Sequence, residues 1–158
     1  MRHRGYVGVV GPGAGPTTEL VRLAEEVGRL LGGARLVVVT GGLDGVMAGA
    51  ARGCERAGGT SIGLLPGSDR ADGNPHSTVT VPTGLGELRN GLLVRACDAL
   101  VAVGCSWGTL TEVALAVRTG VPVVLLGWGA LAEHLPTVLP RATTAQEAVA
   151  LLPEALRG

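Results

Sequence analysis

The chain has 158 residues, a formal net charge of zero at pH 7, and 46% hydrophobic against 16% charged residues, which predicts one globular domain over residues 1–158 and excludes a disordered chain. All 13 basic residues are arginines, so the missing lysine excludes a Schiff base with pyridoxal phosphate and a Walker A phosphate loop. Zero net charge and three aromatic residues argue against a nucleic-acid partner, and no apolar run approaches the roughly 18 residues of a membrane span.

Apolar runs of strand type alternate with helical patterns along the chain. In chain order we expect strand 6–10, helix 17–31, strand 36–40, helix 45–57, strand 60–65, a weaker edge strand 78–81, helix 87–97, strand 99–103, helix 109–119, strand 121–126 and helix 144–152. Most of these strands are continuously apolar, as strands covered on both faces should be. The alternation predicts an α/β fold, with a single Rossmann-like doubly wound parallel sheet and helices on both of its faces.

The expected helix 109–119 is apolar nearly all round. From Leu110 to Val117 only Thr111 and Glu112 are polar. Such a helix must be buried on more than one side, either deep in the domain or against another subunit. We therefore expect a homodimer that uses this helix.

Three strands run directly into glycine-bearing turns that precede helices. In open α/β sheets ligands bind beyond the carboxyl ends of the strands, where free N–H groups of helix N-termini favour anions. These turns predict a phosphate-bearing ligand, although a chain with 27 glycines also places glycine in ordinary turns. The expected ligand contacts on these turns are Gly11, Gly13, Gly41, Gly42, Gly104, Ser106, Trp107, Gly108 and Thr109.

The dinucleotide-binding fingerprint is not present in the first of these turns. Its glycines stand at positions 11, 13 and 15, which is not the GxGxxG spacing. The second strand ends in Thr40-Gly41-Gly42, where an NAD site needs an acidic residue for the ribose. An NAD-dependent dehydrogenase is therefore disfavoured.

Several segments together resemble a known family. They are Gly41-Gly42-Leu43-Asp44-Gly45-Val46-Met47, Ala57-Gly58-Gly59, Ile62-Gly63-Leu64-Leu65-Pro66-Gly67, Arg89-Asn90, Gly108-Thr109-Leu110-Thr111-Glu112 and Gly120-Val121-Pro122-Val123. Over about residues 5–127 they resemble the Lonely Guy (LOG)-like Rossmann family, often mislabelled lysine decarboxylase, and most closely its molybdenum cofactor carrier branch with its short bacterial relatives. The missing lysine excludes the decarboxylase activity.

The resemblance implies a Rossmann-like fold, a homodimer or dimer of dimers, and a site for a nucleotide phosphate. Some members hydrolyse the N-glycosidic bond of nucleoside 5′-monophosphates, whereas others bind a ligand without turnover. The hydrolases use a glutamate in the pattern PGGxGTxxE and an upstream arginine, which match Glu112 and Arg89 as candidate catalytic residues; the neighbouring Asn90 is a candidate ligand contact. A carboxylate there could stabilise positive charge on the sugar, and arginine could hold the phosphate or orient the glutamate.

Both candidate catalytic residues also have a purely structural interpretation. Thr109 to Glu112 fits a capping box, with Thr109 as the N-cap and Glu112 reaching back to its N–H. The segment Thr144-Ala145-Gln146-Glu147 is a second such box, in a place with no claim to chemistry. Arg89 also fits a solvated residue in a first helical turn.

The turn after strand 99–103 departs from the family pattern. Gly104, Cys105 and Ser106 stand where the hydrolases have Pro-Gly-Gly and the carriers usually have three glycines, so two β-carbons replace bare backbone. The Ser106 hydroxyl could replace one lost contact. Cys105 fits either a thiolate at a helix start or a small buried side chain. Trp107 would either stack on a ligand ring or close the turn over the core.

Two functional hypotheses follow, with a scaffold whose site has decayed as a third. The first is a nucleoside 5′-monophosphate phosphoribohydrolase, and the alternative is a non-catalytic carrier of a molybdenum cofactor pterin or a nucleotide. We expect no required cofactor and no metal site. Cys54, Cys97 and Cys105 are odd in number and lack metal-site spacing, which favours reduced thiols and a cytoplasmic location.

Overall fold

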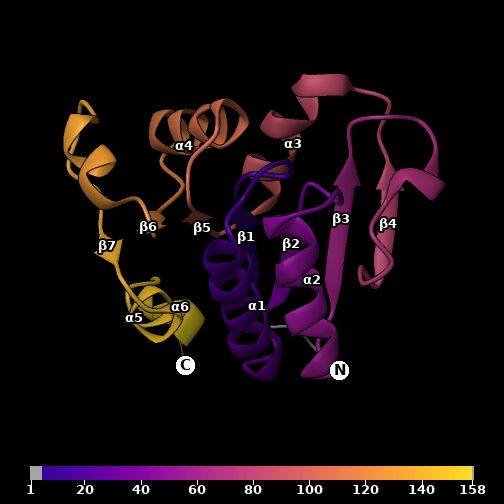
Figure 1. Ribbon diagram of the computed structural model, residues 1–158, viewed down its shortest axis with the longest axis horizontal. Helices are drawn as coiled ribbons and strands as arrows, with labels where there is room; N and C mark the ends of the chain where they lie inside the picture. Colours follow the sequence, from indigo (N-terminus) through magenta and orange to yellow (C-terminus); the bar gives the residue numbers. More distant parts are fainter. Residues whose placement is uncertain (1–4, 158) are drawn as a thin grey trace.

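The computed structural model describes residues 5–157, and its strands form one seven-stranded parallel sheet (Figure 1). The strands are β1 (Tyr6–Val10), β2 (Val37–Thr40), β3 (Ser61–Leu65), β4 (Val79–Pro82), β5 (Ala99–Val103), β6 (Val123–Leu126) and β7 (Arg141–Ala142). Their order is β4-β3-β2-β1-β5-β6-β7, and every neighbouring pair is parallel. The chain therefore starts mid-sheet, builds outward to β4 and crosses back to β5, which confirms the predicted doubly wound α/β fold.

Helices cover both faces of the sheet. One face carries α1 (Thr18–Gly33), α2 (Val46–Arg56), α5 (Ala145–Ala150) and α6 (Glu154–Arg157), and the other carries α3 (Arg89–Ala96) and α4 (Trp107–Thr119). Three 3-10 helices lie in the connections, η1 (Arg70–Asp72), η2 (Gly86–Leu88) and η3 (Gly129–His134). Alternation along β1 divides the core, because Val7 and Val9 face the first layer and Val10 faces the second.

The element boundaries differ from the sequence expectation where backbone chemistry intervenes. The last long strand begins at Val123 rather than at 121, because Pro122 has no N–H for the ladder. The expected helix 87–97 is divided into η2 and α3 at Arg89. The short β7 and α6 were not expected. None of the described helices combines the length and apolar character needed to cross a membrane.

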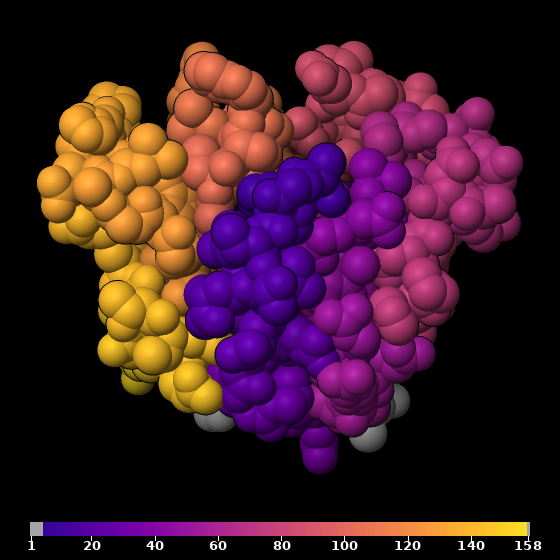
Figure 2. All heavy atoms as spheres, viewed as in Figure 1, coloured from indigo at the N-terminus to yellow at the C-terminus, as the bar shows by residue number. Residues whose placement is uncertain are grey.

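The sheet order brings three of the glycine-bearing turns together. Strand β1 lies between β2 and β5, so the turns that follow these three strands share the carboxyl edge of the sheet at its topological switch point. Figure 2 shows the surface hollowed at this edge, between α4 and the η2–α3 segment and above the loop that follows β1. The fold therefore places the expected phosphate-binding turns around one depression.

Candidate ligand-binding site

A cavity of about 370 Å³ opens at this edge of the sheet, which is within the size range of sites for small molecules. Its lining comes from the carboxyl ends of the central strands and from the starts of α2, α3 and α4. The lining residues are Val10, Gly11, Gly13, Gly41, Leu43, Met47, Pro66, Gly86, Glu87, Arg89, Asn90, Ser106, Gly108, Thr109 and Glu112.

Nine of the twelve residues expected from the sequence line this cavity, and three do not. Gly42 donates its N–H to the Thr40 hydroxyl and so belongs to the turn itself. Gly104 has φ +67°, and a Cβ there would lie 2.7 Å from the Leu20 side chain, so its glycine serves packing of the turn. Trp107 is 86% exposed and neither lines the cavity nor closes the turn over the core.

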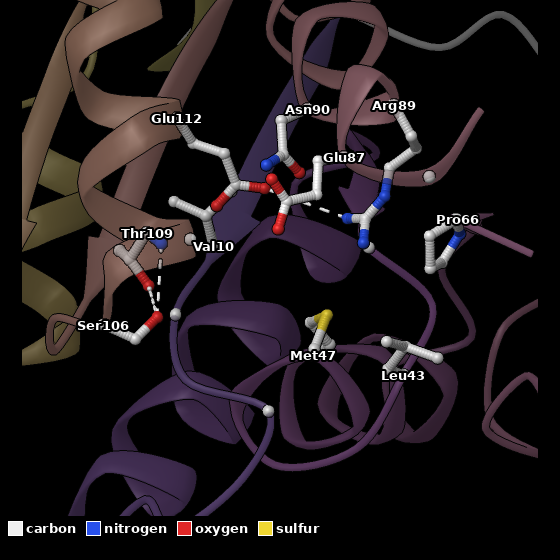
Figure 3. A pocket seen from close by; sticks show the side chains of 15 residues that line it. Val10, Leu43, Met47, Pro66, Glu87, Arg89, Asn90, Ser106, Thr109 and Glu112 are labelled. Carbon is white, nitrogen blue, oxygen red and sulfur yellow. Dashed lines mark hydrogen bonds and ion pairs between the residues drawn. The ribbon is translucent and has the colours of Figure 1, made fainter.

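Sequence reasoning missed the apolar end and one acidic residue of the cavity. Leu43, Met47 and Pro66 line it from the β2–α2 loop, from α2 and from the turn that follows β3, and Figure 3 shows them across the cavity from Ser106 and Thr109. Glu87 on η2 lines the same space. Leu43, Met47 and Pro66 stand within the family-like segments, but nothing in those segments marks them as ligand-facing.

Glu112 lies on the second turn of α4 and faces the cavity (Figure 3). The capping-box interpretation of this glutamate was wrong, because Ser106 rather than Thr109 is the N-cap of α4. The helix therefore begins three residues earlier than the capping box requires. Glu112 is then not at the third helical position, and its side chain does not cap the helix. That side chain is 9% exposed. The predicted capping box at Thr144 and Glu147 is present at the start of α5. The same sequence pattern therefore forms a capping box at one helix and not at the other.

Arg89 opens α3 and points into the same cavity, so the solvated interpretation of this arginine was wrong. Its side chain is 10% exposed, and its Nη1 atom lies 3.9 Å from Oε1 of Glu112. The guanidinium lies against Gly41, where an added Cβ would come 2.2 Å from Nη1. Glycine at position 41 thus makes room for Arg89. The Arg89 Nε atom is buried and has no hydrogen-bond partner among the described residues.

Burial controls the charge state of this pair. Burial raises the pKa of Glu112 to about 7, and the positive charge of Arg89 opposes that rise. Burial also lowers the pKa of Arg89, and Glu112 opposes that change. Both shifts favour the neutral forms, because a gap of 3.9 Å leaves the attraction too weak to offset the loss of hydration. Arg89 remains charged at neutral pH, while Glu112 can both accept and donate a proton.

The N-terminus of α4 forms the opposite wall of the cavity. The Thr109 N–H donates to Oγ of Ser106 at 3.2 Å, and the two hydroxyl oxygens lie 2.9 Å apart. No hydrogen bond within residues 5–157 engages the N–H groups of Trp107 and Gly108, the first two of the helix. Free amides at a helix start attract anions, so this wall can receive a phosphate.

The Cys105 thiol next to this wall is half-buried, and burial raises its pKa. A raised pKa argues against the thiolate interpretation of this residue. Within the described part of the chain, no group of three or more histidine, cysteine or acidic side chains could hold a metal ion.

Comparison with known proteins shows the family and the fold of this chain. The model of the SLOG cluster4 family matches residues 4–154. The molybdenum cofactor binding protein of Rippkaea orientalis superimposes with a TM-score of 0.91 at 33% identity, over 96% of both chains. For the molybdenum cofactor carrier protein of Chlamydomonas reinhardtii the values are 0.87 and 34%, over 98% of both chains. A relative in Archaeoglobus fulgidus is 35% identical over 120 residues, 76% of this chain and 78% of its own. The family resemblance read from the sequence is confirmed.

Proposed function

Because the chain belongs to the SLOG cluster4 family and is similar in structure to molybdenum cofactor carrier proteins, we propose that it binds a phosphorylated, pterin-like small molecule and carries it without turnover. The cavity between α3 and α4 is the proposed binding site. We expect the carrier to act in the cytoplasm, since none of its three cysteines is in a disulfide.

The observation that carries the proposal is a buried polar pair without adequate partners. Among the described residues, Nε of Arg89 has no hydrogen-bond acceptor, and Glu112 faces Arg89 only across 3.9 Å. A buried polar group that lacks a partner costs free energy, so its retention calls for a ligand that supplies one. A ligand that offers an anionic or acceptor group to Arg89 and a hydrogen-bond donor to Glu112 would give both side chains a partner.

The two ends of the cavity suit the two ends of such a ligand. The free amide of Gly108, which lines the cavity, would receive the phosphate. The apolar surface of Leu43, Met47 and Pro66 would cover a planar ring at the other end (Figure 3). Arg89 and Glu112 lie between these ends, where they would contact the polar atoms that join phosphate and ring.

Phosphoribohydrolase activity is the second candidate, and the paired placement of Arg89 and Glu112 favours it. A pKa raised to about 7 would let Glu112 exchange a proton in such a reaction, so the charge state of the pair is compatible with both roles. The carrier role is preferred because carrier proteins are similar to this chain over nearly its whole length. Release of free base from any nucleoside 5′-monophosphate, abolished in Glu112→Gln, would replace the carrier with the hydrolase.

We predict that 6-hydroxymethylpterin phosphate, at a concentration about 100 times its Kd, will raise the Tm by about 5–10 °C. Ligand binding to the folded state alone stabilises it by about 2.7 kcal/mol at that concentration, which gives a shift of this size in a chain of this length. Differential scanning fluorimetry measures the shift, with the unphosphorylated pterin as the matched control. Absence of stabilisation by phosphorylated pterins and by nucleotides would overturn the binding function.

We further propose that the chain is a homodimer built on the outer faces of α3 and α4. These helices pack side by side and leave Leu92 and Val117 exposed, and Leu88 at the end of η2 is exposed beside them in the sequence. Exposed apolar side chains gathered on neighbouring helices are typical of a subunit interface. In this dimer α4, which the sequence shows to be apolar nearly all round, is covered on one side by its own sheet and on the other by the partner subunit.

Leu92→Glu and Val117→Glu are each expected to convert the dimer into a monomer, because a charge would be buried in the interface. Light scattering coupled to size-exclusion chromatography gives the mass of each variant. Val138→Glu is the control, since Val138 is 94% exposed and lies outside both helices. A monomeric wild-type chain would refute this assembly.

A further inference from the structure

We propose, on the basis of the proposed binding function, that the Ser106 hydroxyl competes with the ligand phosphate for the N–H of Thr109 and thereby sets how tightly the phosphate is held. Ser106 is the N-cap residue of α4 and lines the cavity. The chain would thus hold within its own binding site a group that favours release of the ligand.

The contacts of Ser106 place its hydroxyl where an anion would bind. Its Oγ atom accepts the Thr109 N–H at 3.2 Å and lies 2.9 Å from Oγ1 of Thr109. The backbone carbonyl of Ser106 accepts the N–H of Leu110, as expected of an N-cap residue. Of the N–H groups at the start of α4, those of Trp107 and Gly108 have no acceptor among the described residues, and that of Thr109 is occupied.

The cavity itself indicates that this helix start faces a ligand. Ser106, Gly108 and Thr109 line the same cavity as Arg89 and Glu112. Both of these side chains are about nine-tenths buried, and Nε of Arg89 has no partner among residues 5–157. An anion that reaches Arg89 from the mouth therefore also meets the turn that Ser106 caps.

Competition follows because one N–H makes one good hydrogen bond at a time. A phosphate oxygen that approaches Thr109 must displace Oγ of Ser106, and the hydroxyl recovers the N–H when the phosphate leaves. The helix start thus remains satisfied in both states, which stabilises the ligand-free state and weakens binding of the phosphate. A carrier that must hand its ligand on gains from such weaker binding.

Ser106→Gly is expected to bind 6-hydroxymethylpterin phosphate about fivefold more tightly than wild type, the equivalent of one recovered hydrogen bond. Glycine is a good N-cap residue, so the variant keeps α4. Ser106→Thr keeps a hydroxyl and should bind as wild type does. Thr144→Ala removes an equivalent cap from α5, away from the cavity, and should lower the Tm without changing the affinity. Isothermal titration calorimetry measures all four proteins.

The unphosphorylated pterin separates an effect on the phosphate from an effect on the fold. We expect no gain in affinity for it in Ser106→Gly. An equal gain for both pterins, or equal or weaker binding of the phosphorylated pterin by Ser106→Gly, overturns the competition by Ser106 and leaves the binding function intact. Failure of both wild type and Ser106→Gly to bind the phosphorylated pterin overturns the binding function and this inference together.

Discussion

Arg89→Ala is expected to weaken binding of a phosphorylated pterin about 100-fold. Arg89 is the cation that lines the cavity of the described chain, and its Nε donor has no partner there. Charge-assisted hydrogen bonds from a buried guanidinium contribute about 1.5–3 kcal/mol each, so the loss of a bidentate contact gives an effect of this size. Isothermal titration calorimetry with 6-hydroxymethylpterin phosphate measures the affinity.

The measurement belongs at about pH 6, because removal of Arg89 leaves Glu112 without its compensating charge. Burial already raises the pKa of Glu112 to about 7, so at pH 6 this carboxyl is largely protonated and the variant avoids a buried, unpaired charge. Arg95→Ala is the matched control, since Arg95 lies on the same helix but is exposed. Binding by Arg89→Ala within threefold of wild type would contradict the assigned position of the ligand.

The strands and their parallel arrangement could be predicted because burial on both faces leaves a clear pattern in the sequence. Strands β1 and β5 are short apolar runs that end at glycine, and the helices between strands have one apolar side. The two-residue strand β7 carries no such pattern, because it pairs only with β6 at the sheet edge. Its position depends on the path of the chain after η3, which no local pattern predicts.

The candidate site could be predicted at the level of turns but not of individual contacts. Two overlapping caps were available at the start of α4, Ser106 with Thr109 and Thr109 with Glu112, and both fit the local rules. The structure selects Ser106, and only this choice frees Glu112 for the cavity. Gly41 lines the cavity, as expected, but the atoms that an added Cβ would meet there belong to Arg89 and Met47, which lie 48 and 6 positions further along the chain.

Glu112→Gln is expected to remove a loss of stability that wild type shows as the pH rises from 5 to 8. The pKa of Glu112 is about 7 in the folded chain against 4.5 for an ordinary glutamate. Between these values the folded state binds more protons than the unfolded state, so the free energy of unfolding falls with rising pH and levels off above about 7. The gap between the two pKa values sets an upper limit of about 3 kcal/mol for this loss.

Urea denaturation at intervals between pH 5 and pH 8 measures the effect. Glu147→Gln is the control, because the pKa of Glu147 is shifted in the opposite direction from that of Glu112. Hydrogen bonds from the backbone and hydroxyl of Thr143, and from the backbone of Thr144, lower the pKa of Glu147. Its contribution is therefore present above pH 4.5 and lost as the pH falls through its folded pKa, which leaves the slope from pH 5 to 8 unchanged. If Glu112→Gln and wild type lose the same stability across this range, the carboxyl is not held in the dry cavity that the binding proposal requires. If only wild type loses it, then a ligand phosphate will bind more tightly to Glu112→Gln than to wild type at pH 8, because the repelling charge is gone.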